Sequence, residues 1–274
     1  MAVKLFVCIF FVIFQLNAHA FRAKVSKPIF SPIAEDIQGI TQTADYWFIS
    51  NQYNIYRVPK EKKLIPRNFY PNIIDSYPVI KIPKELEKLG YNHFGGISIY
   101  QNYLIVALER VQPLKILFFD IDTLVHEKTY DVPMSLESLS WVASNGSQIY
   151  FSENKLNKNS PLYKYNPSKN MLENFYIPAK ISKIQGGTIS KNINTLFLAS
   201  DKGRRAGGIY AINLNTLEVK HEVGILYNRG FPAYQEVEGL TFNDSKNPIK
   251  ITLLLLDNNL VEDSFHFIEV SDFL

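Results

Sequence analysis

The chain has 274 residues, of which 46% are hydrophobic and 20% charged, and this composition excludes an intrinsically disordered protein. Its formal net charge is only +3 and its basic residues are scattered, so no basic face for nucleic acid is indicated. The single cysteine, Cys8, lies in a leader-like segment, which excludes disulfides and cysteine-based sites from the rest of the chain.

Residues 1–20 have the features of an export signal. Lys4 supplies a positive charge, Leu5–Leu16 is apolar, and Ala18-His19-Ala20 matches the small-x-small cleavage pattern. The apolar run is too short for an ordinary membrane span, and no second run of about 20 apolar residues follows. We therefore predict cleavage near Ala20, a single domain over residues 21–274, no transmembrane segment, and a secreted or periplasmic location.

After this leader, one sequence pattern recurs at intervals of about fifty residues, which is typical of repeat architectures. Each copy opens at a small residue, usually glycine, and closes at an acidic or amide side chain. The copies cover Asp36–Asn51, His93–Glu109, Glu137–Glu153, Lys183–Asp201 and Glu236–Asp257. We align them on Gly39, Gly96, Ser140, Gly187 and Gly239.

Each copy reads as four β-strands. The opening glycine leads a short strand, a polar turn follows, and the second strand is rich in β-branched and aromatic residues. A third strand such as "ILFFDID" (116–122) and a fourth such as "YPVIKIP" (77–83) complete the unit, and only Lys84–Gly90 has a helical pattern, of one or two turns. Antiparallel four-stranded units repeated in this way predict an all-β fold, a β-propeller, because each sheet must bury its faces against its neighbours.

The number of blades depends on how the ring closes. The last copy lacks a fourth strand at the C-terminus, whereas residues 21–32 form a spare strand before the first copy. We predict that this N-terminal strand closes the last blade, which gives five blades of four antiparallel strands. Six blades are the alternative if the long Lys60–Gly90 connection holds further strands.

The strand order predicts a ring of polar side chains at one mouth of the channel. In an antiparallel hairpin the start of one strand lies beside the end of its partner, and the first strand of each blade lines the channel. The entries to the first strands are Asp36, His93, Glu137, Gln185 and Glu236, with Glu238 beside the last. The exits from the second strands are Asn51, Glu109, Glu153, Asp201 and Asp257. The opening glycines allow the strands to approach the axis closely.

Converging carboxylates repel one another, so a bound cation, shifted pKa values or nearby Lys and Arg side chains must neutralise part of the charge. Oxygen ligands without cysteine favour Ca²⁺ or Mg²⁺, and we expect Ca²⁺ as the cofactor. The candidate ligands are Asp36, Asn51, Glu109, Glu137, Glu153, Asp201, Glu236 and Asp257. The alternative is that these residues cap strand ends, bond the backbone of turns, or pair with Arg110, Lys202 and Arg204.

Four further residues are candidates at the same mouth. His93 is the one histidine at a ring position, and it can serve as a general base or ligand, or simply as a hydrogen-bonded strand-end residue. Arg204 and Arg205 lie in a glycine-rich loop between two strands, where they can meet an anionic substrate. Tyr234 is an aromatic candidate for substrate contact.

The segments "EVEGLTF" (236–242) and "DIQGIT" (36–41) resemble the blade openings of exported propellers in the gluconolactonase–paraoxonase group and the phytase-like esterases. This resemblance implies a central Ca²⁺ held by Glu, Asp and Asn, with lactone or phosphoester hydrolysis above it. Carried over by position, it implies His93 as base and ligands at Asp36, Asn51, Glu137, Glu153, Asp201, Glu236 and Asp257.

Two functions therefore stay open. The first is a Ca²⁺-dependent hydrolase of lactones or phosphoesters, acting on a small molecule. The second is a non-enzymatic propeller that binds a protein, a glycan or a metabolite on the same face. For either function we expect a monomer that does not bind nucleic acid.

Overall fold

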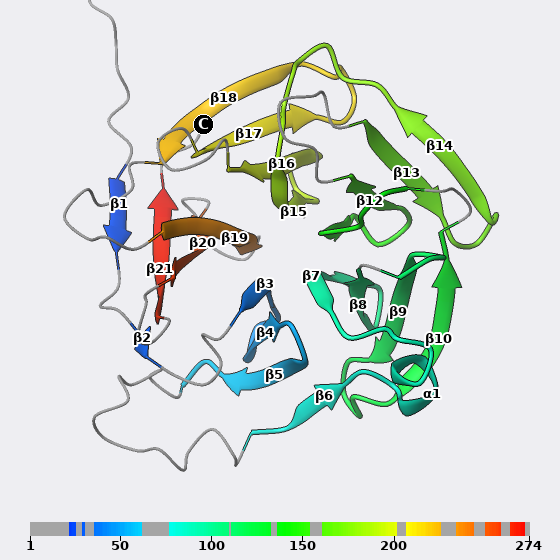
Figure 1. Ribbon diagram of the computed structural model, residues 1–274. Coiled ribbons are helices and arrows are strands. Elements are labelled where there is room, and N and C mark those ends of the chain that lie inside the picture. Colours follow the sequence, from blue (N-terminus) through cyan, green and yellow to red (C-terminus); the bar gives the residue numbers. More distant parts are fainter. Residues whose placement is uncertain are drawn as a thin grey trace, which may run out of the picture.

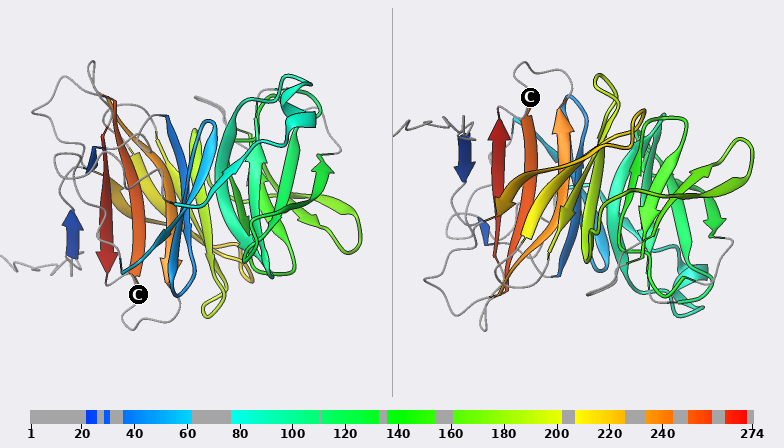
Figure 2. Two further views of the ribbon diagram at one scale, coloured as in Figure 1. Left: turned by 90° about the horizontal axis from the view of Figure 1, so that it is seen from below. Right: turned by 90° about the horizontal axis from the view of Figure 1, so that it is seen from above.

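The computed structural model describes residues 22–25, 29–30, 36–61, 77–109, 111–132, 136–153, 161–201, 207–225, 234–243, 250–258 and 264–271. Five antiparallel sheets stand in a ring about a central axis, the channel axis of a propeller, which confirms the predicted five-bladed β-propeller (Figure 1). Seen from the side, the strands run roughly along the channel (Figure 2). The predicted export signal lies outside the described residues. Within those residues, no helix has the length and apolar character needed to cross a membrane.

The first four blades each contain four strands that follow one another along the chain. Blade 1 comprises β3 (Ile37–Gln42), β4 (Tyr46–Asn51), β5 (Asn54–Pro59) and β6 (Val79–Lys81). Blade 2 comprises β7 (Phe94–Tyr100), β8 (Tyr103–Leu108), β9 (Lys115–Asp120) and β10 (His126–Asp131), preceded by the single turn of α1 (Lys84–Glu87). Blade 3 comprises β11 (Val142–Ser144), β12 (Ile149–Ser152), β13 (Leu162–Asn166) and β14 (Met171–Phe175). Blade 4 comprises β15 (Ile184–Ser190), β16 (Thr195–Ser200), β17 (Gly207–Asn213) and β18 (Val219–Ile225).

Blade 5 joins the two ends of the chain. It comprises β19 (Tyr234–Asn243), β20 (Lys250–Asn258) and β21 (Ser264–Ser271), with β1 (Arg22–Val25) as its outer strand. The antiparallel register of β1 on β21 begins with Arg22 opposite Ser271, and the short β2 (Ile29–Phe30) pairs with the other end of β21. The prediction that an N-terminal strand closes the last blade is therefore confirmed.

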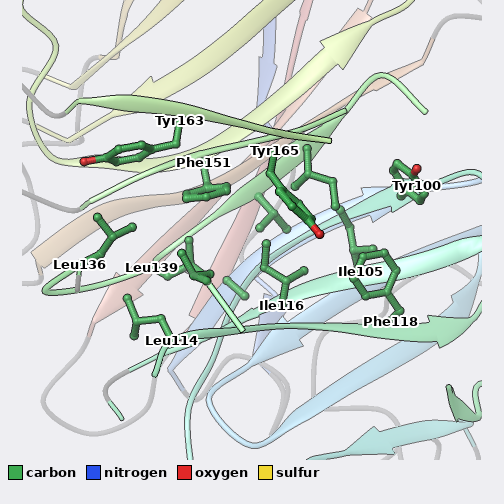
Figure 3. Close-up of a cluster of buried hydrophobic side chains, with 14 residues drawn as sticks. Tyr100, Ile105, Leu114, Ile116, Phe118, Leu136, Leu139, Phe151, Tyr163 and Tyr165 are labelled. Atoms are coloured by element: carbon green, nitrogen blue, oxygen red, sulfur yellow. The ribbon is translucent and has the colours of Figure 1, made fainter. Parts of the chain in front are cut away.

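The hydrophobic core is divided among the blade interfaces. Five clusters of buried side chains each contain residues from two neighbouring blades, and together they cover every interface of the ring. In the cluster of Figure 3, Ile116 and Phe118 of blade 2 pack against Phe151 and Tyr165 of blade 3. Fully burying a side chain of this size stabilises a fold by about 1.5–3 kcal/mol. The blades therefore hold one another in place, as the repeat predicts.

Glycines allow the inner strands to meet around the channel. A Cβ atom added to Gly39 would lie 2.8 Å from the Cα atom of Gly96, and one added to Gly186 would lie 2.8 Å from that of Gly239. We call these four residues the axial glycines. In blade 4 the axial residue is Gly186, so our alignment on Gly187 was wrong by one residue.

Blade 3 has Ser140 where the other blades have an axial glycine, and Trp141 follows it. The Trp141 side chain is fully buried, and a Cβ atom added to Gly187 would lie 2.4 Å from its ring. The indole Nε1 donates a hydrogen bond to Ser152 Oγ at 2.9 Å. The indole thus fills the space between β11 and β15.

Candidate functional site at the acidic mouth

The strand register brings the predicted entries and exits together at one end of the channel. The carbonyl of Asp36 accepts a hydrogen bond from the amide of Gln52 at 3.1 Å, and that of His93 accepts from Glu109 at 2.9 Å. In blade 4 the carbonyl that accepts from Asp201, at 2.9 Å, belongs to Lys183. We call this end of the channel the acidic mouth. Its described side chains are Asp36, Asn51, His93, Glu109, Glu137, Glu153, Lys183, Asp201, Glu236 and Glu238.

Two exit residues hold backbone groups. Asn51 is 3% exposed, and its Oδ1 accepts hydrogen bonds from the amides of Tyr53 at 3.1 Å and Asn54 at 2.8 Å. Glu153 is 4% exposed, and its Oε1 accepts a hydrogen bond from the amide of Glu137 at 2.9 Å. These contacts correspond to the strand-capping alternative, because the oxygens satisfy backbone donors at the ends of strands.

Between blades 4 and 5, a lysine neutralises the carboxylates. The Nζ atom of Lys183 lies 2.6 Å from Oδ2 of the buried Asp201 and 3.5 Å from Oε1 of Glu236. Burial alone would lower the pKa of Lys183, but its hydrogen bond to Asp201 and the carboxylates of Glu236 and Asp201 raise that pKa above 10.5. A nearby lysine side chain is therefore one means by which the charge of these carboxylates is neutralised.

Glu238 shows a second means, a shifted pKa. Its side chain is buried, and burial together with the charge of Glu236 raises the pKa of Glu238 well above 4.5. A hydrogen bond between the two side chains favours the protonated form of Glu238 further. Glu238 occupies a β-bulge, because the pairing of β19 with β20 shifts between Val237 and Gly239. Bulges re-aim side chains and are common beside functional sites.

Blade 2 contributes a buried histidine and carboxylate. His93 Nε2 lies 4.0 Å from Glu109 Oε2, and the two residues are 2% and 8% exposed. Gly95 makes room for this carboxylate, since a Cβ atom there would lie 2.8 Å from Glu109 Oε1. His93 therefore lies within the mouth as predicted, yet it is covered from solvent.

The remaining candidates are exposed to solvent, lie at another position in their blade, or fall outside the described residues. Asp36 and Glu137 are exposed to solvent. The side chains of Tyr234 and Asp257, and the whole of Arg204, Arg205, Arg110 and Lys202, lie outside the described residues. Gln185 lies beside Gly186, the position that Glu238 takes in blade 5, so it is not the entry residue of blade 4.

Lys183 is the functional candidate that our sequence reasoning missed. It lies three residues before Gly186, as Asp36, His93 and Glu236 lie three residues before their own axial glycines. The signal was present in the "KIQGG" segment (183–187), but alignment on the second glycine concealed it.

Several described donors of the acidic mouth have other partners, and the side chain of the candidate ligand Asp257 lies outside the described residues. Within the described residues, no group of three or more His, Cys, Asp and Glu side chains converges in a way that could hold a metal ion. The oxygens of Asn51 and Glu153 already accept backbone hydrogen bonds, and Lys183 supplies positive charge beside Asp201. Calcium at the axis stays a prediction.

No protein-family model matches the sequence, and no curated protein matches it. Among solved structures, the fold is similar to Myxococcus xanthus glutaminyl cyclase, with a TM-score of 0.58 and 9% identity over 92% of this chain and 97% of that chain. It is also similar to a chain of a nidogen/laminin complex, with a TM-score of 0.52 and 11% identity over 80% of this chain and 75% of that chain. Likeness at such low identity establishes the fold class, a β-propeller.

Proposed function

We propose that the protein is an exported hydrolase that acts at the acidic mouth, with Glu236 as the general base. The observation that carries this proposal is the carboxyl pair of Glu236 and Glu238. Glu238 is 4% exposed and has a raised pKa, whereas the side chain of Glu236 is 30% exposed at the mouth. Neighbouring carboxyl groups in different environments divide into an acid and a base, which is the arrangement that hydrolysis requires.

In the proposed reaction, Glu236 accepts a proton from the attacking water as the water oxygen bonds to the substrate carbonyl carbon. The ammonium of Lys183, 3.5 Å from Glu236, stabilises the negative charge that develops on the carbonyl oxygen. The tetrahedral intermediate then loses its alkoxide, and the carboxyl pair returns the proton to that alkoxide. Water and an ester or lactone thus yield a hydroxyl group and a carboxylic acid.

The charge of the mouth favours neutral substrates. Asp201 and Glu236 carry negative charge that the single ammonium group of Lys183 offsets only in part, and the remaining charge repels the anionic phosphoester group. Lactones and carboxylic esters are neutral at the reacting carbonyl. Of the two substrate classes expected from the sequence, we therefore propose lactones and esters. The similarity to a cyclase supports an enzyme on this fold without defining its substrate.

The proposal is tested by turnover of a panel of lactones, aryl esters and phosphoesters, in Ca²⁺ and in EDTA. We expect hydrolysis of a lactone or ester in both conditions, and a loss of about 10²–10⁴-fold in kcat for Glu236→Gln. Glu173→Gln, in the ion pair with Lys164 on blade 3, is the matched control and should retain full activity. The absence of turnover on every substrate would contradict the proposal.

Calcium is tested separately, by the melting temperature of the protein with Ca²⁺, with Mg²⁺ and with a chelator. A rise of several degrees that Glu236→Gln abolishes would support an axial ion. The absence of a shift with either ion would contradict it. The proposed acid–base reaction does not depend on this result.

A non-enzymatic propeller is the second candidate, and the engagement of Asn51 and Glu153 in backbone hydrogen bonds favours it. The nidogen/laminin complex supports the use of this fold for protein binding. The complement of an acidic face is a basic peptide or protein segment. We expect such a peptide to bind at low salt and to bind more weakly to Glu236→Gln. Equal binding to both proteins would contradict this alternative.

A further inference from the structure

The channel has a second polar end, opposite the acidic mouth. The inner strands begin at the acidic mouth, and a cavity of about 290 Å³ lies at their opposite ends. All five blades contribute a hydroxyl group to its lining, from Thr41, Ser98, Ser144, Thr188 and Thr241. We call this cavity the hydroxyl pocket; the inner strands that line it surround the centre of the ring in Figure 1. Its volume is at the lower end of the roughly 300–1,000 Å³ typical of ligand sites, which suits a small molecule.

The positions of these hydroxyls follow from the strand period. Thr41, Ser98, Thr188 and Thr241 each lie two residues after an axial glycine, so they face the same side of the strand as that glycine. That side is the channel. Blade 3, which has Trp141 near the axis, contributes Ser144 from the end of β11 instead.

These hydroxyl groups are enclosed yet available to a ligand. Thr41 and Ser98 are 7% exposed and Thr241 is 2% exposed. Within the described part of the chain, the hydroxyls of Thr41, Ser98, Thr188 and Thr241 make no hydrogen bond to another protein group. Enclosed hydroxyls are stabilised by hydrogen bonds, and a bound molecule or water can supply them here.

The lining is rich in donors and positive charge. Lys191 lines the pocket, and its Nζ atom lies 3.3 Å from the point that a Cβ atom on Gly146 would take. Gln42 also lines the pocket, and its Oε1 accepts a hydrogen bond from Lys60 Nζ at 2.6 Å. No carboxylate lines the cavity within the described chain.

We propose that the hydroxyl pocket binds a small hydroxy-carboxylate, a molecule with one or more carboxylate groups and further hydroxyls on a short carbon chain. Its carboxylate oxygens match the ammonium group of Lys191, and its hydroxyls match the ring of Thr and Ser side chains. Phe242 and Ile99 supply an apolar wall for the carbon chain. The acidic mouth repels such an anion, so the two ends of the channel differ in specificity. This inference is independent of the proposed hydrolase.

The test is isothermal titration calorimetry of the mature protein with citrate as the probe and glucose, a neutral polyol, as the control ligand. Both titrations contain EDTA, so citrate cannot produce a signal by removing calcium from the protein. We expect citrate to bind one site per chain and glucose not to bind. Loss of one hydrogen bond of about 1 kcal/mol corresponds to about fivefold in Kd, so Thr241→Val should raise the Kd for citrate by about that factor. Lys191→Met removes a charge and should weaken it by about tenfold or more.

Two controls separate this pocket from the rest of the protein. Thr252→Val changes a buried threonine that pairs with Thr241 on the neighbouring strand β20 but does not line the pocket. This variant should leave citrate affinity unchanged. Glu236→Gln, at the acidic mouth, should leave it unchanged as well. If Thr241→Val fails to fold, Ser98→Ala takes its place. Equal affinity for glucose, no binding of citrate, or affinity unaffected by the pocket variants would overturn the proposal.

Discussion

The two ends of the channel are built from the same five inner strands, yet they differ in what their polar groups do. At the acidic mouth, the charged side chains are occupied by one another and by the backbone, as in the contacts of Lys183 with Asp201 and of Glu153 with Glu137. At the hydroxyl pocket, Thr41 and Thr241 form no such contacts within the described chain. A ring of charges must be neutralised within the protein, whereas a ring of hydroxyls can be satisfied by water or a ligand. Substitutions at the acidic mouth should therefore cost more stability than substitutions at the hydroxyl pocket.

Lys183→Met tests this difference most severely. The substitution leaves Asp201 buried without its cation, and breaking a buried ion pair in this way costs about 3–5 kcal/mol. We expect the free energy of unfolding in urea to fall by about that amount. Lys164→Met removes the partner of Glu173 in a pair whose side chains are 25% and 40% exposed, and it should cost only about 0–1 kcal/mol. Equal losses in the two variants would show that Lys183 does not hold the mouth together.

Gly39→Ala tests the narrow part of the channel between the two ends. The new methyl group would lie 2.8 Å from the backbone of Gly96, and overpacking of this kind costs about 1–3 kcal/mol. Because the obstacle is backbone, β3 and β7 must move apart. Urea unfolding measures the loss directly. A cost below about 0.5 kcal/mol, the range of ordinary surface substitutions, would contradict close contact at the axis.

Glu238→Gln tests the protonated carboxyl group through pH. Because folding raises the pKa of Glu238, the folded state binds its proton more tightly and is favoured at low pH. That stability is lost as pH rises from 4.5 through the raised pKa, by up to about 1.4 kcal/mol per pH unit. Glutamine cannot titrate, and its amide still donates to Glu236. The melting temperature of the variant should therefore rise relative to that of the wild type as pH increases. A difference that stays constant with pH would argue against a protonated Glu238.

Thr241→Val should have the smallest effect on stability. Valine has nearly the shape of threonine, and the lost hydroxyl makes no hydrogen bond within the described chain, so we expect a change within about 0.5 kcal/mol. Ser50→Ala is the matched comparison, because Ser50 Oγ donates to the carbonyl of Gly95 at 3.0 Å across two blades. Its loss should cost about 1 kcal/mol in urea unfolding. A large cost for Thr241→Val would mean that the hydroxyl pocket is structural.

The architecture was predictable because the repeat specifies it. Five openings, four strands per copy and a spare N-terminal strand are properties of linear order, and β1 pairs with β21 as expected. The site was predictable only to the level of one end of the channel. Antiparallel pairing locates strand entries and exits, but it does not show which carboxylates are occupied by backbone amides or by lysine.

Two features were missed for physical reasons. The sequence does not show which of the adjacent glycines Gly186 and Gly187 meets the neighbouring inner strand, and alignment on Gly187 concealed Lys183. The proton on Glu238 depends on burial, which two carboxylates two residues apart in a sequence do not disclose. The hydroxyl pocket had a sequence signal, since Thr41 and Thr241 follow their axial glycines by two residues. That signal appears only when the opposite end of the channel is considered.

The closure of blade 5 by β1 sets an order of events during synthesis. The strand β21, which pairs with β1, follows the strands of the other four blades in the chain, so β1 has no partner in its sheet until those blades have been produced. Blades 1 to 4, by contrast, are composed of strands that are consecutive in the chain and can pair as they emerge. An open sheet edge at β1 is prone to pairing with other chains. The ring therefore closes at the seam where β1 meets β21, and the yield of closed rings depends on how quickly β21 reaches that edge.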